Sequence, residues 1–101
     1  MSLLDKNING ISQLCKKYSV ETLYAFGSVL TPRFNESSDI DLLVNFKKTE
    51  IPLHIYADNF FDFMYELEHL FNRKVDLVCE DAISNPYFRQ ELEETKKLIY
   101  G

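Results

Sequence analysis

A chain of 101 residues has room for one compact domain, which excludes an enzyme that carries its own large substrate-binding domain. Hydrophobic residues make up 46% of the sequence and aromatic residues 14%, which excludes a disordered chain, because disordered chains lack the apolar surface that offsets the entropy cost of ordering. The formal net charge of -5 repels nucleic-acid backbones and speaks against a direct DNA- or RNA-binding protein. We therefore treat residues 1–101 as a single domain.

Cysteine usage and the N-terminus indicate a cytoplasmic protein. Cys15 and Cys79 fit neither a metal-ligand spacing nor a disulfide framework, and are typical of a reducing compartment. Residues 1–12 lack the basic start and apolar run of a signal peptide. No stretch approaches the roughly 20 apolar residues of a membrane span, so we expect no membrane partner.

Apolar spacing predicts a helix before the first strand. Residues that recur at intervals of three and four share one helical face, and they are Leu4, Ile8, Ile11, Cys15 and Tyr18. Residues 20–26 are rich in β-branched and aromatic side chains and stop at Gly27-Ser28, which predicts a short strand and a tight turn. The polar stretch that ends at Ser38 is typical of a loop.

Alternation predicts a second strand over residues 39–46. The apolar row of this strand should lie against helices and contains Ile40, Leu42, Val44 and Phe46. The opposite row carries Asp39 and Asp41 and should therefore open toward solvent or a site.

Two more helices and a third strand complete the predicted α+β fold. Pro52 is well placed to begin a long helix that reaches Phe71, because proline is tolerated in a first turn. Residues 74–79 predict a third strand, and a last helix should run from Pro86 to Ile99. We expect a small mixed sheet with helices packed on one face.

The candidate site residues are Gly27, Ser28, Asp39, Asp41 and Asp76. Two aspartates at i and i+2 on a strand project from one face, where their hard oxygens suit Mg²⁺. Asp76 adds a third carboxylate if its strand lies beside the second one, and three such charges repel one another unless a cation lies among them. Gly27 lets a phosphate approach the backbone, and Ser28 offers an N–H and a hydroxyl.

The stretch GSVLTPRFNESSDIDLLVNF, followed by KVDLV at residues 74–78, resembles the minimal nucleotidyltransferases of the polymerase-β-like superfamily. It is most similar to the small bacterial antitoxins encoded beside HEPN-domain toxins, and the resemblance covers nearly the whole chain. The resemblance implies that Gly27 and Ser28 hold the nucleotide triphosphate and that Asp39 and Asp41 bind metal. It also implies that Asp76 helps to bind a second metal and activates the attacking hydroxyl.

The mechanism that the resemblance implies is nucleotidyl transfer through two Mg²⁺ ions, with ATP as substrate. The acceptor that the resemblance implies is a tyrosine hydroxyl of a HEPN ribonuclease toxin, with which the chain would form a hetero-oligomer. Many members have Ala-Arg-Gly shortly after Gly-Ser, whereas this chain has Leu30, Thr31 and Pro32. Arg33 is the residue that could replace the missing arginine.

The sequence is compatible with three functions. The first is an Mg²⁺-dependent protein adenylyltransferase antitoxin, and the second is an antitoxin that acts by binding alone and keeps a vestigial site. The third is a small-molecule nucleotidyltransferase that modifies an antibiotic or metabolite. The intact set of site residues favours activity, and the missing second domain speaks against a small-molecule acceptor.

Overall fold

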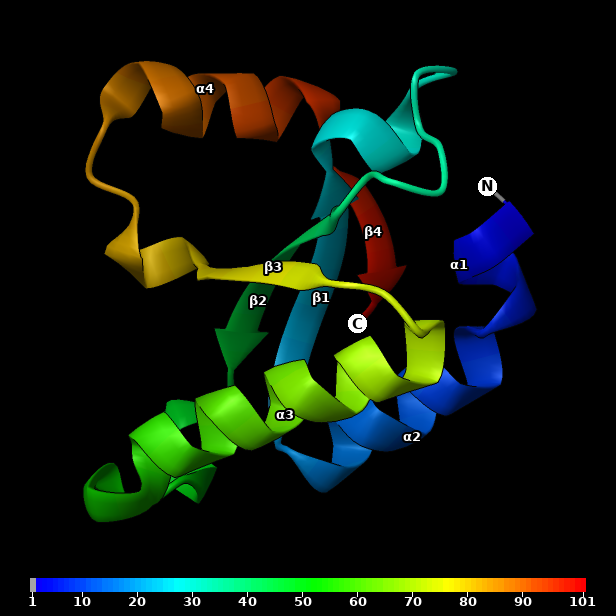
Figure 1. Cartoon of the computed structure of the whole chain (residues 1–101). Helices are drawn as coiled ribbons and strands as arrows, with labels where there is room; N and C mark the ends of the chain where they lie inside the picture. Colours follow the sequence, from blue (N-terminus) through cyan, green and yellow to red (C-terminus); the bar gives the residue numbers. More distant parts are fainter. Residues whose placement is uncertain (1) are drawn as a thin grey trace.

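A four-stranded mixed sheet organises the computed structural model, which describes residues 2–101 (Figure 1). The strand order is β3-β2-β1-β4. β1 (Val20–Phe26) runs antiparallel to β2 (Ile40–Phe46), and β3 (Val75–Cys79) runs parallel to β2. β4 (Lys97–Tyr100) lies antiparallel to β1 at the other edge. The predicted α+β class and mixed sheet are confirmed.

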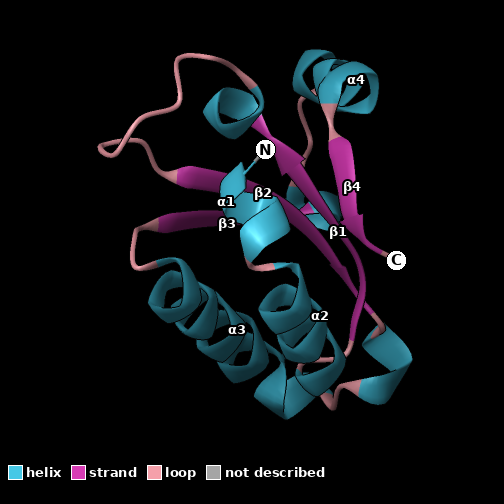
Figure 2. Ribbon diagram, turned by 90° about the vertical axis from the view of Figure 1, so that its right-hand side faces the viewer, coloured by secondary structure: helices cyan, strands magenta, loops and turns pink. Residues whose placement is uncertain are grey.

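Two helices cover one face of this sheet. α2 (Ile8–Lys17) and α3 (Tyr56–Phe71) lie side by side there, and the short α1 (Ser2–Lys6) precedes them (Figure 2). The core beneath the helices includes the predicted apolar row of β2, namely Ile40, Leu42, Val44 and Phe46. Among residues 2–101, no helix combines the length and the apolar character that crossing a bilayer requires.

A smaller apolar cluster lies on the opposite face of the sheet, under α4 (Pro86–Thr95). Leu43 of β2 is fully buried there, together with Ile83 and Leu92. The face of β2 that also carries Asp41 is therefore covered in its middle, and it is less open than the alternation of β2 predicts.

The C-terminal segment differs from the predicted helix through Ile99. α4 ends at Thr95, and Lys96 adopts an extended backbone that leads directly into β4. Leu92 packs in the smaller cluster whereas Ile99 packs against the main core, so the two residues do not share one helical face. β4 forms because the outer edge of β1 offers backbone hydrogen-bonding groups, which the sequence of the last residues does not reveal.

The first predicted helix is present but interrupted. Asn7 ends α1, and its side-chain amide donates a hydrogen bond to the carbonyl of Leu3 at 2.9 Å. α2 then continues the predicted spacing, with Ile11 and Cys15 fully buried. The break turns one expected helix into two.

α3 begins at Tyr56 instead of Pro52. The 3-10 turn Leu53–Ile55 precedes it, and the side chain of Leu53 is 91% exposed although the spacing places it on the core face. Phe63 occupies the centre of the core instead, with no exposed surface. The backbone of Pro52 is extended, so this residue lies outside the helix that follows.

We expect Phe63→Ala to lower the free energy of unfolding by about 3–5 kcal/mol, because it leaves a cavity between α3 and the sheet. Phe61 on the same helix is 47% exposed and provides a matched control. Phe61→Ala should cost less than about 1 kcal/mol. Urea denaturation followed by circular dichroism measures both losses, and equal losses would contradict this packing.

Candidate active site

The residues predicted to form a site meet where β1 ends and where β2 and β3 begin. The antiparallel pair sets Phe26, the last residue of β1, opposite Asp41, and the parallel pair sets Asp41 beside Asp76. Asp39 immediately precedes β2, which begins at Ile40 and not at Asp39 as predicted. The register of the sheet therefore gathers three carboxylates next to the turn that follows β1.

Gly27 occupies a position that no other residue fits without strain. Its φ is +73°, in the left-handed region that L-residues with a side chain rarely adopt. A Cβ at this position would lie 2.5 Å from Oδ2 of Asp41. The backbone of the Gly-Ser turn thus reaches the aspartate that lies at the centre of the carboxylate group.

The turn continues as a short 3-10 helix, Gly27–Leu30. Thr31 closes this helix: its backbone N–H and its hydroxyl both donate to the carbonyl of Ser28, each at 2.9 Å. The hydroxyl of Ser28 makes no hydrogen bond with any of residues 2–101. It is therefore available to a ligand.

Electrostatic repulsion concentrates on Asp41. Burial raises the pKa of its carboxyl above the ordinary value, and the negative charges of Asp76 and Asp39 raise it further. Asp39 and Asp76 are exposed, while Asp41 is half-buried between them. A cation placed among these groups would favour their ionised forms and relieve the repulsion.

The donor set fits Mg²⁺ bound together with a nucleotide. Within residues 2–101, no three acidic, histidine or cysteine side chains stand close enough to form a preformed metal cage. Mg²⁺ does not generally need one, because it is usually held by one or two carboxylates, substrate phosphates and waters. Asp41 and its two acidic neighbours offer this kind of partial coordination.

Arg33, the predicted substitute for the arginine that many relatives carry, is exposed in the loop after Thr31. Its backbone N–H donates to the Thr31 hydroxyl at 3.3 Å. Its guanidinium forms no ion pair or hydrogen bond with the part of the chain that the structure describes. Its role at a phosphate stays a prediction.

Arg73, which no sequence pattern singles out, contacts the loop before Asp39. Its Nη1 donates to the carbonyl oxygens of Asn35 and Ser38, both at 2.9 Å. These partners lie 38 and 35 residues away along the chain, so no local pattern could have revealed the contact.

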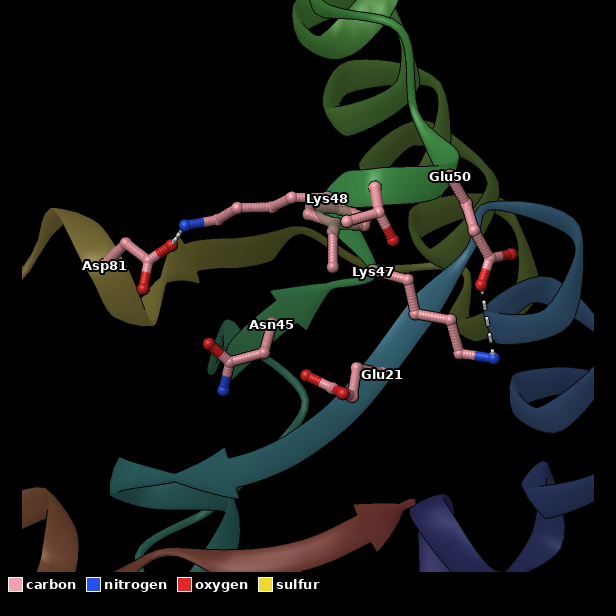
Figure 3. Close-up of a pocket in the computed structure, with 8 residues that line it drawn as sticks. Glu21, Asn45, Lys47, Lys48, Glu50 and Asp81 are labelled. Carbon is pink, nitrogen blue, oxygen red and sulfur yellow. Dashed lines mark ion pairs between the residues drawn. The ribbon is translucent and has the colours of Figure 1, made fainter.

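A separate polar hollow of about 470 Å³ opens at the other end of β2 (Figure 3). Its basic residues are already paired with carboxylates: Lys48 with Asp81, and Lys47 with Glu50 at 3.9 Å. The hollow is remote from the three aspartates, and we do not assign it to the candidate site.

Residues 9–101 match the family model of the polymerase beta nucleotidyltransferases. The chain belongs to this family. It is similar to the provisionally named protein adenylyltransferase MJ0128 of Methanocaldococcus jannaschii, with 41% identity over 87 residues that span 86% of this chain and 82% of that protein. A second protein of that organism, MJ1379, carries the same provisional description and is 34% identical over 84 residues, 83% of this chain and 79% of its own.

Solved structures confirm the predicted nucleotidyltransferase fold. One, described provisionally as a minimal nucleotidyltransferase, has a TM-score of 0.77 and 26% identity, covering 96% of this nucleotidyltransferase and 95% of that chain. A chain of a toxin–antitoxin crystal structure with AMP-PNP has a TM-score of 0.72 and 24% identity, with coverages of 94% and 73%. A chain from the complex of a tri-AMPylated Shewanella oneidensis HEPN toxin with an MNT antitoxin has a TM-score of 0.67 and 22% identity. This match covers 97% of our chain and 72% of that chain.

We expect Asp41→Asn to stabilise the metal-free protein at neutral pH. The pKa of Asp41 is raised in the folded state, so the folded protein holds this proton at pH values where the unfolded chain has released it. Stability therefore falls as the pH rises from the unfolded pKa of 3.8 through the higher folded pKa, and the cost persists at pH 7.

Thermal unfolding in EDTA measures this effect. Asp41→Asn should melt above the wild type at pH 7, and this advantage should shrink at pH 3, where the wild-type carboxyl is mostly protonated in both states. Asp62→Asn, at an exposed site on α3, is the control. The change in melting temperature between pH 3 and pH 7 should be the same for this variant as for the wild type. A lower melting temperature of Asp41→Asn at both pH values would contradict the electrostatic argument.

We expect Gly27→Ala to cost about 1–2 kcal/mol of folding stability, because a residue with a Cβ resists the left-handed backbone. Gly10 in α2 is the matched control, since a Cβ there meets the flexible end of Leu70, whose Cδ1 lies 2.9 Å away. Alanine's higher helix propensity offsets that contact, so Gly10→Ala should stay within about 1 kcal/mol of the wild type. Urea denaturation compares the two variants, and equal stabilities would refute the constraint at Gly27.

Proposed function

We propose that this chain is an Mg²⁺-dependent protein adenylyltransferase that transfers AMP from ATP to a tyrosine hydroxyl of a HEPN-domain toxin and thereby neutralises it. The observation that carries this proposal is the close approach of the Gly27 backbone to Asp41, with Asp39 and Asp76 beside it. The relatives support it, because two of them are provisionally named protein adenylyltransferases and a structural neighbour is a complex that contains an AMPylated HEPN toxin.

The nucleotide would be held by the turn after β1. The absence of a Cβ at Gly27 lets a phosphate approach the backbone, and the unused hydroxyl of Ser28 is a hydrogen-bond donor for a phosphate oxygen. The exposed guanidinium of Arg33 would meet the triphosphate from the loop that follows. These groups bind and orient the α-phosphate for attack.

The carboxylates would serve the metal and the acceptor. Two Mg²⁺ ions held by Asp39, Asp41 and Asp76 would neutralise charge on the triphosphate and on the departing pyrophosphate. The acceptor oxygen forms a bond to the α-phosphorus, and the bond from that phosphorus to the oxygen bridging the β-phosphate breaks. Asp76 would take the proton of the attacking hydroxyl, and pyrophosphate leaves.

The position of Asp76 favours a protein acceptor. Asp76 is exposed and lies on β3, an edge strand of the sheet, so a side chain on another protein's surface can reach it. Hollows of about 470 and 490 Å³ open near the other end of β2 and β3, and the hollow of about 540 Å³ beside Arg73 and Lys74 is lined by none of the three aspartates. This arrangement favours a toxin over an antibiotic or metabolite as the acceptor.

Two further features are compatible with a cytoplasmic protein whose substrate is a nucleotide. The thiols of Cys15 and Cys79 are both free, as in the reducing cytoplasm where we place the protein. The net charge of -5 is compatible with a nucleotide that arrives with Mg²⁺ and disfavours direct binding to nucleic acid.

Transfer of label from α-labelled ATP to a purified HEPN-domain toxin tests the proposal. The double variant Asp39→Asn/Asp41→Asn should lower labelling by more than about 100-fold, since even outer-shell partners of metal ligands are worth roughly 10- to 100-fold. Asp62→Asn should retain full labelling, and circular dichroism checks that every variant is folded. Undiminished labelling by the double variant would remove the aspartates from catalysis.

The stoichiometry of neutralisation separates catalysis from binding alone. With ATP and Mg²⁺, a substoichiometric amount of this chain should silence the ribonuclease, and mass spectrometry should find AMP on a tyrosine. A one-to-one requirement that does not depend on ATP would support the binding-only antitoxin with a vestigial site.

A further inference from the structure

We propose that Arg73 is a positioning residue of the candidate site. Arg73 holds Asp39 in place because it connects the loop before Asp39 to the turn between α3 and β3. The consequence for metal binding and transfer rests on the proposed function. The contacts themselves do not, because they are geometric features of the fold.

The guanidinium of Arg73 makes three contacts with the loop. Nη1 donates to the carbonyl oxygens of Asn35 and Ser38 at 2.9 Å each, and the guanidinium carbon lies 4.6 Å from the centre of the Phe34 ring. A lysine ammonium could also donate to two carbonyls, but it lacks the planar guanidinium that lies over the Phe34 ring while Nη1 donates. Ser38 is the residue directly before Asp39, so the contact acts next to the carboxylate.

The loop segment that Arg73 holds is a preformed unit. The Asn35 N–H donates to the Ser38 hydroxyl at 3.1 Å, and the Ser38 N–H donates to the Asn35 carbonyl at the same distance. The side chain of Asn35 also accepts a hydrogen bond from the N–H of Ser37 at 2.8 Å. Arg73 therefore docks a turn that is already closed, and this docking fixes where the turn lies relative to the sheet.

The backbone of Arg73 is anchored at the end of α3. Asn72 ends the helix in the left-handed conformation, and the Arg73 N–H donates to the carbonyl of Glu68 at 3.3 Å. The carboxylate of Glu68 accepts a hydrogen bond from the N–H of Val75 at 3.1 Å. The guanidinium thus projects from a fixed base, and Asp76 follows three residues later.

The position of Asp39 depends on the contacts of Arg73 more than the positions of Asp41 and Asp76 do. Asp41 and Asp76 lie within paired strands, whereas Asp39 lies just outside β2. On its C-terminal side, the Ile40 N–H donates to the carbonyl of Lys74 at 3.0 Å. On its N-terminal side, the link nearest to Asp39 is the hydrogen bond from Arg73 to the carbonyl of Ser38. Loss of that hydrogen bond would leave the residue directly before Asp39 without its contact to the turn between α3 and β3.

Arg73→Gln tests the proposal, with Mn²⁺ as a spectroscopic probe for Mg²⁺. In the presence of AMP-PNP, Mn²⁺ affinity measured by electron paramagnetic resonance should fall roughly 10- to 100-fold. Hydrogen exchange of the Ile40 amide should accelerate, while exchange within the rest of β2 stays slow. Arg73→Lys keeps the positive charge without the planar group over the Phe34 ring and should give an intermediate loss of Mn²⁺ affinity. This variant also serves as the test if Arg73→Gln does not fold.

Arg89→Gln is the matched control. Nη2 of Arg89 likewise donates to two loop carbonyls, those of Glu80 at 3.2 Å and Ile83 at 2.6 Å, in the connection before α4. Its loss should lower the melting temperature without changing Mn²⁺ affinity. A merely structural role of Arg73 would produce this same result.

A double-mutant cycle identifies the carboxylate that Arg73 acts through. In an Asp39→Asn background, Arg73→Gln should have little further effect on Mn²⁺ affinity, whereas in an Asp76→Asn background its effect should persist. Equal additivity in both backgrounds, or wild-type Mn²⁺ affinity in Arg73→Gln, would overturn the proposal. A wild type that binds Mn²⁺ and AMP-PNP but transfers no AMP would contradict the proposed function alone. A wild type that binds neither would overturn both proposals.

Discussion

The register of β2 between two neighbours of opposite direction is the constraint on which the site depends. The antiparallel pairing with β1 brings the Gly27 turn onto Asp41, and the parallel pairing with β3 brings Asp76 to the same place. A shift of either pair by one residue would turn an aspartate to the other face of the sheet. The apolar row of β2 opposes such a shift, because it would expose a buried core. Core packing and site geometry are thus enforced by the same pairing.

The candidate site lowers the stability of the folded protein when no cation is bound. Burial and two neighbouring charges raise the pKa of Asp41, so its ionised form lowers stability at neutral pH. A sequence selected for stability alone would place a neutral residue there. Local conflict of this kind is expected where a ligand supplies the compensating charge. Mg²⁺ with a nucleotide is a ligand of that type, and the acidic net charge of the protein is consistent with it.

The segment after β3 completes the second face of the sheet. Lys96 lies at the junction of α4 and β4, where its ammonium donates to Glu80 at 3.1 Å and to Glu93 at 2.8 Å. The ammonium also lies 4.2 Å from the centre of the Tyr24 ring. Burial lowers the pKa of Lys96, but the two carboxylates outweigh that effect and raise it. These contacts hold α4 across the sheet while its last residues enter β4.

Local sequence patterns identify the candidate site residues, because the Gly-Ser turn, the paired aspartates and the aspartate of β3 each stand out among their neighbours. The periodicities of β2 and α3 are local in the same way. The strand β4, the covering of Leu43 and the hydrogen bond from Arg73 to Ser38 arise only in the tertiary structure. Each of these joins segments far apart in the chain. Local periodicity cannot encode such partners, because the free energy comes from edge hydrogen bonds and packing that exist only once the sheet has formed.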